Sequence, residues 1–468
     1  MAQRKGKIFM DRLLAAAVCF QLFWVLFDLA CPQSLFLPEL SSLLLAAALT
    51  AKAVSALVAG PKLPKLGATS WWLALSVSAY LLIDALCFLR SGGALFWEKY
   101  RVVGVSLLTA AGLAACLMKG LLHPKQIFSV IWFSGIAVGI VALADSFLLN
   151  FTLNPYTYRI TTRVDYNMYA TVLFCAGCGG FGVWLKSRRR MADQLLFLLS
   201  AAFLWVMAYL SGSRRILLAL LPVSLVFVVF LIRDNAKKPQ LLASAAVGVI
   251  LLSLFSAAAA AAWENSSVTV QENAPPSETS LSQRYETVTS PAADNESGAL
   301  KTRTALWRAA LREIYTAYLP HTAAFWFGKG GGWDIRLYDR LLAEGADSEL
   351  SAVFADGEKY AGKLSAHNFL LTDMLCGGVV KLLSGVVLWG VISAAAVKAF
   401  KKDYRSALPV ILITAAVLAN NLISNRYGFL YDKYFYVSII LIVGILERGT
   451  ADERQNGYLH NDLGAPEG

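Results

Sequence analysis

The chain is poor in charge: only 16% of its 468 residues are Asp, Glu, Lys or Arg, whereas 57% are hydrophobic. Soluble domains carry about 25% charged residues, so the composition argues against a soluble protein. Charge is also scarce in repeated apolar runs of about 20 residues, the length that a helix needs to cross a bilayer. The net charge of +11 comes mostly from short segments between these runs, without basic and aromatic residues interleaved on a polar domain. Nucleic acid is therefore not indicated as a partner.

Other absences narrow the chemistry. None of the seven cysteines falls in the long polar segment of the chain, so no disulfide framework is indicated. Cys175 and Cys178 have CxxC spacing, but they lie in an apolar run, where small residues that pack between helices explain them better. There are only four histidines. HExxH, a closely spaced Asp pair and GxSxG are all missing, so neither a metal centre nor a nucleophile elbow is indicated.

What remains is an all-α, polytopic membrane protein with about twelve predicted transmembrane helices. In the short segments, Lys and Arg are concentrated on the side that holds the N-terminus, which favours both termini in the cytoplasm. The first apolar run is too long for an ordinary signal peptide and is interpreted as a retained helix. The predicted spans are residues 12–31, 34–59, 70–90, 101–119, 126–149, 166–185, 192–211, 214–232, 240–262, 367–397, 405–424 and 430–447.

One long segment, residues 263–365, interrupts the pattern between the ninth and tenth spans and is predicted to lie outside the cell. Its first part is rich in Ser, Thr, Asn, Glu and Pro, which is typical of flexible chain. From residue 301 on, apolar residues at helical spacing predict an amphipathic helix on or near the membrane surface, followed by a glycine-rich turn at 327–333 and more helix over 334–350. The domains expected are residues 1–262, 263–365, 366–447, and a disordered cytoplasmic tail at 448–468.

His367 stands where this polar segment meets the tenth span. An interfacial histidine that reaches for water is the simplest reading. If Ser365 caps the helix, however, His367 lies in its first turn, where the helix dipole disfavours the imidazolium ion. A neutral imidazole at a water-accessible face can accept a proton, as a general base must.

Arginines are the other candidates. Arg214 and Arg215 lie in a short outer turn, against the positive-inside trend, and arginine grips phosphate in a bidentate manner. Arg284 and Arg303 lie in the large segment. Arg308 and Arg312 are better explained as a solvated helix face. The glycines around Gly330 form a turn that is not a Walker P-loop, although such turns can also bind anions through backbone N–H groups.

Three motifs in order carry a family resemblance: SGSRR at 211–215, RTALWRAALREI…FGKGGGW at 303–333 and AHNFLL at 366–371. With this topology, the chain resembles the O-antigen ligase and O-antigen polymerase superfamily of bacterial membrane glycosyltransferases. It departs from the family's pattern at the turn, where the sequence GKGGG replaces the more usual glycine–proline motif. The stretch around Pro320 and His321 also lengthens the approach to that turn.

The resemblance implies a GT-C-like enzyme of the bacterial inner membrane, without metal or cofactor, that transfers a glycan from undecaprenyl diphosphate to a glycan or lipid-glycan acceptor. It implies that His367 is the general base and that the transfer inverts the anomeric carbon. The residues implied to bind diphosphate are Arg214, Arg215, Arg284 and Arg303, and those implied to support the site are Trp307, Gly330 and Asn368. Ligase and polymerase are not separated by the sequence. A transporter or flippase for lipid-linked saccharides is the alternative, and would predict charges deep in several spans, where Asp84, Asp145 and Lys381 are the main candidates.

Overall fold

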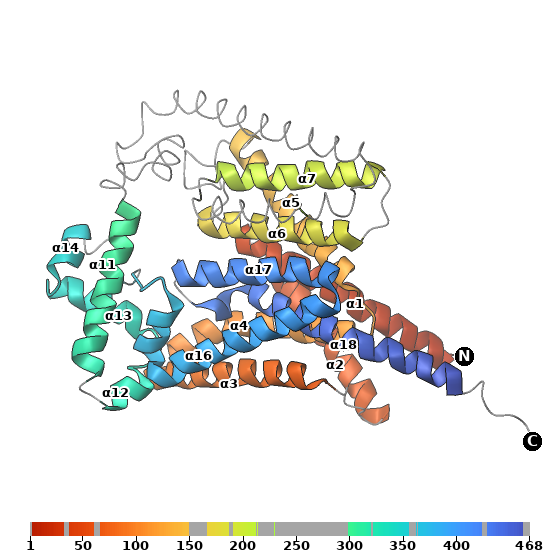
Figure 1. Cartoon of the computed structure of the whole chain (residues 1–468), viewed down its shortest axis with the longest axis horizontal. Coiled ribbons are helices and arrows are strands. Elements are labelled where there is room, and N and C mark those ends of the chain that lie inside the picture. The colour runs from red at the N-terminus through yellow and green to blue at the C-terminus, as the bar shows by residue number, and fades with distance from the viewer. Residues whose placement is uncertain are drawn as a thin grey trace, which may run out of the picture. The chain divides into compact units, whose positions relative to one another are not determined.

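The computed structural model describes a large part of the chain in which every regular element is a helix (Figure 1). The residues described are 2–31, 37–59, 66–148, 166–186, 191–211, 213, 229, 298–319, 322–354, 362, 364–423 and 428–461. The predicted eighth and ninth spans and the Ser-rich part of the large segment fall almost wholly outside these ranges.

Within the described residues, eight helices are long and apolar enough to cross a membrane. They are Ile8–Ala30, Leu37–Val54, Ala68–Ser91, Phe96–Met118, Pro124–Asp145, Tyr166–Lys186, Phe369–Lys402 and Tyr404–Leu422. These helices confirm an all-α polytopic membrane protein, and each begins and ends within several residues of a predicted span.

The chain divides into two compact units, and the first comprises residues 1–59, 119–295 and 408–416. Its helices are α1 (Ala2–Ala30), α2 (Leu37–Ala59), α5 (Pro124–Leu148), α6 (Tyr166–Lys186) and α7 (Met191–Leu210). Small residues let α5 and α6 approach closely: a Cβ at Gly135 would lie 2.1 Å from the Cβ of Ala176. Cys175 and Cys178 are buried in α6 and form no disulfide, so their interpretation as small packing residues is confirmed.

The second unit comprises residues 60–118, 296–407 and 417–468. Its long helices are α3 (Ala68–Ser91), α4 (Gly93–Met118), α16 (Phe369–Lys402) and α18 (Lys433–Asn461), and α17 (Tyr404–Ile423) contributes its two ends. Helix α16 is interrupted at Gly378, whose φ of 65° and ψ of −163° are not helical. A short 3₁₀ helix, η4 (Phe429–Tyr431), precedes α18.

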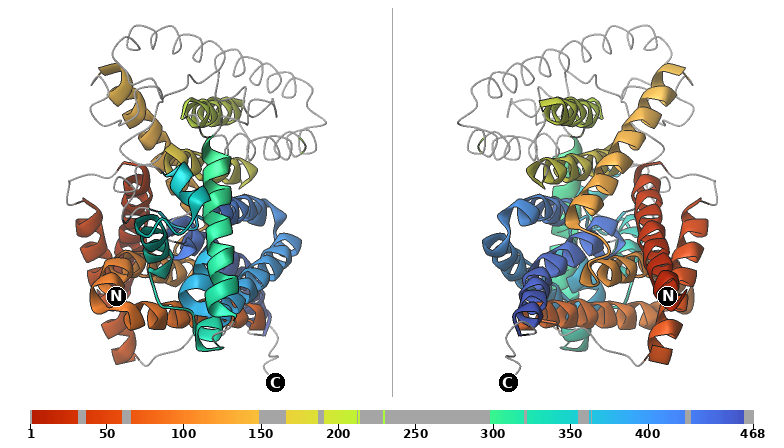
Figure 2. Two further views of the ribbon diagram at one scale, coloured as in Figure 1. Left: turned by 90° about the vertical axis from the view of Figure 1, so that its left-hand side faces the viewer. Right: turned by 90° about the vertical axis from the view of Figure 1, so that its right-hand side faces the viewer.

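The second half of the large segment forms a helical layer in this unit, made of α11 (Gly298–Glu313), the π-helix η3 (Ile314–Tyr318), α12 (Thr322–Phe327), α13 (Trp333–Ala343) and α14 (Ser348–Val353). Figure 2 shows α11 in green beside α14 and α13 in teal. The predicted amphipathic helix, the turn and the later helix are confirmed. Three apolar residues of α11, Ala305, Leu306 and Ala309, pack against Tyr338, Leu350, Phe354, Leu364 and Ala366 of the same unit. Contact of this helix with the membrane surface stays a prediction.

The end of the chain also differs from the prediction. Helix α18 continues to Asn461, so residues 448–461 are helical where a disordered tail was expected. Ala451, Glu453, Arg454 and Gln455 are good helix formers and extend the apolar helix without a break.

Candidate functional site

His367 lies in the segment that leads into α16. Its φ of 50° is in the left-handed region, which few non-glycine residues adopt. Asn368 is the N-cap of α16, because its side-chain oxygen accepts hydrogen bonds from the N–H groups of Leu370 (2.9 Å) and Leu371 (3.3 Å). The prediction that Ser365 caps this helix is therefore wrong. His367 precedes the helix instead of lying in its first turn, so the dipole argument for a neutral ring does not apply.

Trp307 of α11 holds the backbone next to His367. Its indole Nε1 donates a hydrogen bond to the carbonyl oxygen of Ala366 at 2.9 Å, and Ala366 itself is fully buried. Backbone strain persists only where the surrounding structure fixes it. The Trp307 bond on one side and the Asn368 cap on the other supply that constraint, and the His367 side chain is half-buried between them.

Arg303 is half-buried on α11, one helical turn before Trp307 and thus about 6 Å along the helix axis. Residues four apart lie on the same side of a helix, so Arg303 is on the side of α11 that reaches Ala366. Arg308 and Arg312 are more exposed, and form ion pairs with Glu349 at 2.8 Å and Asp347 at 2.9 Å. Their interpretation as a solvated face is confirmed.

The glycine-rich turn has a packing role. The N–H groups of Lys329 and Gly330 donate to the carbonyl oxygens of Leu375 and Cys376, two to three residues before the break in α16 at Gly378, at 3.2 and 2.8 Å. The N–H of Gly331 donates to Cys87 of α3 at 2.8 Å. Because these amides already have partners, the anion-binding interpretation of the turn is wrong.

Neither the turn nor the break in α16 has room for a larger side chain. A Cβ at Gly328 would lie 2.5 Å from the backbone of Cys376, and one at Gly378 would lie 2.5 Å from the backbone of Trp326. The Lys329 ammonium is also committed, since it forms an ion pair with the buried Glu313 at 2.7 Å. Gly330 therefore belongs to the seam between the turn and the broken helix.

The remaining predicted site residues lie outside the described part of the chain. These are Arg214, Arg215 and Arg284. Just before the first two, Ser213 is buried and its hydroxyl donates to Asn167 of α6 at 2.9 Å, in the first unit.

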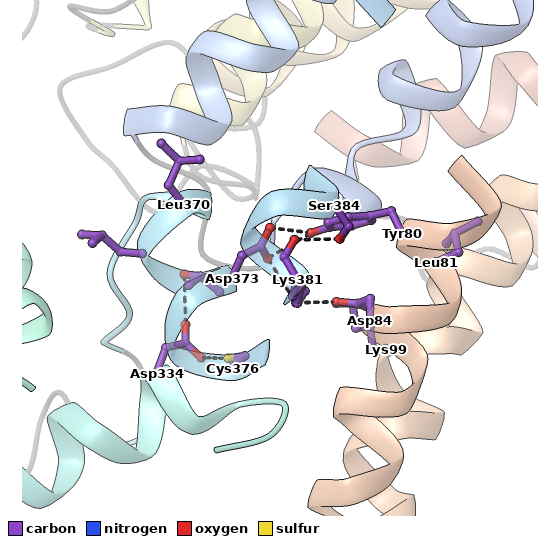
Figure 3. Close-up of polar contacts among 12 residues, drawn as sticks. Tyr80, Leu81, Asp84, Lys99, Asp334, Leu370, Asp373, Cys376, Lys381 and Ser384 are labelled. Carbon is purple, nitrogen blue, oxygen red and sulfur yellow. Dashed lines mark hydrogen bonds and ion pairs between the residues drawn. The ribbon is translucent and has the colours of Figure 1, made fainter. Parts of the chain in front are cut away.

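A buried network of charges, which the sequence did not predict, links α3, α4 and α16 (Figure 3). Lys381 forms ion pairs with Asp84 at 2.7 Å and with Asp373 at 3.1 Å, and Lys99 pairs with Asp84 at 2.8 Å. All four side chains are at least 95% buried. Ionisable groups inside a membrane protein are costly to bury and tend to mark functional positions.

Two phenols complete the network. The hydroxyl of Tyr80 donates to both oxygens of Asp373 at 2.9 Å, and that of Tyr100 donates to Asp84 at 2.8 Å. The ammonium of Lys99 lies 4.1 Å from the centre of the Phe88 ring and 5.6 Å from that of Tyr431, which are favourable cation–π contacts.

This network forms one wall of a cavity of about 290 Å³. The charged residues around the cavity are Asp84, Glu98, Lys99, Asp334, Arg336, Asp373 and Lys381, and its aromatic residues are Tyr80, Phe88, Phe429 and Tyr431. They come from the second half of α3, the first turns of α4 and α13, both sides of the break in α16, and η4. The cavity therefore lies beside the first half of α16, the helix that His367 precedes.

Asp334 lies in the first turn of α13, in the helical layer, and faces the network (Figure 3). It is 3% exposed, and burial raises the pKa of its carboxyl, against the opposing effect of the Cys376 thiol, the Ile335 N–H and the Lys381 ammonium. A carboxyl whose pKa is raised in a cavity is a candidate functional group.

In the sequence, Asp84 and Lys381 stand out only as charges in apolar runs, and Lys99 lies between the predicted spans 70–90 and 101–119. No local motif marks Asp373 or Asp334. The available signal was that Asp373 and Lys381 lie eight residues apart in one apolar run, with Asp84 in another. Opposite charges in separate membrane helices are expected to pair.

The fold and this site are those of a polytopic membrane protein with a polar cavity between its long helices and a layer of shorter helices. Residues 198–386 match the family model described as O-antigen ligase, which confirms the resemblance of this part of the chain to the O-antigen ligase superfamily. The match supports a membrane glycosyltransferase of the ligase or polymerase kind. No curated protein matches the chain.

Proposed function

We propose that this chain moves a glycan from an undecaprenyl-diphosphate carrier to an acceptor hydroxyl at the outer face of the cytoplasmic membrane. The observation that carries the proposal is that the O-antigen ligase match includes both Arg303 and His367. The helix of Arg303 is bonded to the residue before His367 through Trp307. A cation and a proton acceptor on one framework are what a diphosphate-leaving transfer needs.

The proposed step needs one base and one charge-stabilising group. His367 takes the proton of the acceptor hydroxyl while the acceptor oxygen forms a bond to the anomeric carbon. The bond between that carbon and the diphosphate oxygen breaks, and its electron pair leaves with undecaprenyl diphosphate. Attack opposite the leaving group inverts the anomeric carbon. Diphosphate leaves readily once its charge is balanced by fixed cations, so no metal or cofactor is invoked.

The arginines are proposed to supply that balance. Arg303, with Arg214, Arg215 and Arg284, binds the diphosphate through charge-assisted hydrogen bonds, which arginine makes in bidentate geometry. Trp307 and Asn368 are positioning residues in this proposal, because one fixes the backbone before His367 and the other caps the helix after it.

The proposed location follows from the cation distribution. With both termini in the cytoplasm, the loop layer, His367 and the adjoining ends of α3, α4 and α16 face outward. Membrane lipids surround the long helices, and the donor reaches the site from the outer leaflet.

A transporter or flippase of lipid-linked saccharides is the second candidate. A transporter is expected to have charged residues in several membrane helices, and the buried network has them. The four charges gather around one cavity instead of being spread along the helices. That placement suits a binding site at one face better than a path across the membrane.

Product analysis with the purified, reconstituted full chain separates the two functions. The substrates are lipid-linked oligosaccharides and candidate acceptors extracted from a host that lacks the chain. Release of undecaprenyl diphosphate together with an extended or newly linked acceptor supports transfer, and the glycan length distinguishes polymerase from ligase. Unchanged lipid-linked oligosaccharide that has crossed the bilayer would contradict transfer and support transport.

A further inference from the structure

The Asp334 carboxyl is buried but weakly partnered. Its hydrogen-bond donors are the backbone N–H of Ile335, the Thr372 hydroxyl at 3.4 Å and the Cys376 thiol at 3.6 Å. A good O–H···O hydrogen bond to a carboxylate is 2.5–3.0 Å long, so the Thr372 contact is weak. None of the ion pairs among the described residues includes Asp334, although a carboxylate can accept about four hydrogen bonds.

The other buried carboxylates of the cavity contrast with it. Asp84 accepts from Lys99, Lys381 and Tyr100 at 2.7–2.9 Å, and Asp373 accepts from Lys381 and Tyr80. Burying a carboxyl that has no ammonium or short hydroxyl donor is unfavourable. A carboxyl that lines a cavity with part of its acceptor capacity unfilled is suited to receive donors from a ligand.

The lining tells which ligand chemistry fits. Its carboxyl groups, Asp84, Glu98, Asp334 and Asp373, outnumber its cations, Lys99, Arg336 and Lys381. The cations do not outnumber the carboxyl groups, so the cavity has no excess of positive charge to balance a diphosphate. Hydroxyl groups donate to carboxylates and accept from ammonium groups, and a sugar ring also has a C–H face that packs on aromatic rings such as Phe88 and Tyr431.

Size and place agree with a sugar. About 290 Å³ is at the lower end of small-ligand pockets, which span roughly 300–1,000 Å³, so one ring fits better than a longer glycan. Thr372 and Asp373, which line the cavity, lie in the first turn of α16, about 6 Å along the axis from the helix start. His367 is two residues before that start.

We infer that this cavity is a subsite for one sugar ring of a glycan substrate, in which Asp334 accepts hydrogen bonds from ring hydroxyls. The inference rests on the proposed function, and it adds a binding position next to the reacting centre. The ring belongs to either the donor or the acceptor glycan, because both carry the same hydroxyl chemistry.

Saturation-transfer NMR tests the binding on the detergent-purified full chain, with the methyl glycosides of glucose, galactose, rhamnose and N-acetylglucosamine as probes. At least one glycoside should receive saturation from the wild type. Its Kd should rise at least tenfold in Asp334→Ala, and stay unchanged in Glu344→Gln, which changes an exposed carboxyl at the other end of α13. No binding by the wild type, or equal binding by Asp334→Ala, would overturn the inference.

If Asp334→Ala does not fold, Thr372→Phe fills the cavity from α16 and should abolish the same binding; undiminished binding would likewise overturn the inference.

Kinetics then identify the source of the ring. Asp334→Asn should raise KM at least tenfold for one substrate, lipid-linked oligosaccharide or acceptor, with a smaller change in kcat. Transfer with both KM values unchanged would overturn this inference alone. Asp334-dependent glycoside binding by a chain that transfers nothing would overturn the proposed function and keep the sugar site.

Discussion

Asp84→Asn is the sharpest test of the buried network. Asp84 is 1% exposed and is the shared partner of two ammonium groups. The substitution keeps the shape of the side chain but removes its charge. Lys381 retains Asp373 as a partner, whereas Lys99 retains only its contacts with Phe88 and Tyr431. The loss therefore falls mainly on Lys99.

Breaking a buried ion pair from one side costs about 3–5 kcal/mol, because the other charge stays buried without a partner. We expect Asp84→Asn to lower the free energy of unfolding by about that amount. Adding Lys99→Met, which removes the stranded charge, should recover at least half of it, a coupling that a double-mutant cycle measures.

The assay is reversible unfolding of the full chain in mixed micelles of SDS and a mild detergent. Glu98→Gln, an exposed carboxyl next to Lys99, serves as the control and should stay within about 0.5 kcal/mol of the wild type. An Asp84→Asn variant within about 1 kcal/mol of the wild type, or a double variant no more stable than it, would refute the reasoning.

Three further predictions concern the seam, the arginines and Asp334. Gly378→Ala should lower the free energy of unfolding by at least 2 kcal/mol, because the added Cβ would lie 2.5 Å from backbone atoms at a φ of 65°. Gly390→Ala in the same helix meets nothing within 4 Å and should be neutral or stabilising. Equal losses of Tm in the two variants would count against the seam. Arg303→Ala should reduce transfer by about 30- to 1,000-fold through loss of a charge-assisted contact worth about 2–4 kcal/mol, with partial rescue by lysine, and Arg308→Ala should be mild; similar rate losses would indicate a folding defect. Because the pKa of Asp334 is raised above the ordinary 3.8, its proton is held more tightly in the folded chain, so wild-type unfolding free energy should fall as pH rises above that value. Asp334→Asn should lack this contribution, so parallel stability–pH profiles would contradict the burial argument.

The long helices and the loop layer could be predicted because their apolar patterns are local. Span 70–90 became α3 at Ala68–Ser91, and the helical spacing of Ala305, Leu306 and Ala309 located α11. What this face packs against could not be predicted, since periodicity marks an apolar side without naming its partner. The structure shows that Ala305, Leu306 and Ala309 pack on other helices of the same unit.

The network and the break in α16 depend on contacts far apart in the chain. Lys99 looks like a loop cation in the local sequence FWEKYR, and only its pairing with Asp84 explains its burial. Gly377 and Gly378 sit in an apolar run that reads as continuous helix. The N–H groups of Lys329 and Gly330 replace the helical hydrogen bonds that the break removes, which local propensity does not encode.

At the candidate site, residue types were easier to predict than geometry. Ser365 and Asn368 are both good N-cap residues, and the choice between them depends on the left-handed backbone of His367. Trp307 holds that backbone from α11, 59 positions away in sequence. The histidine could therefore be singled out from the sequence, but the predicted start of the helix relative to it was wrong.

The rate of undecaprenyl diphosphate release by His367→Ala tests the central claim most directly. The variant is compared with wild type and with His321→Ala, which changes the histidine within residues 263–365, at matched expression and thermal stability. Loss of a general base lowers a rate by about a hundred- to ten-thousand-fold. The account predicts a loss of that size in His367→Ala, with donor binding retained and His321→Ala near wild type. A His367→Ala rate near that of wild type would contradict it, and would make His367 an interfacial histidine only.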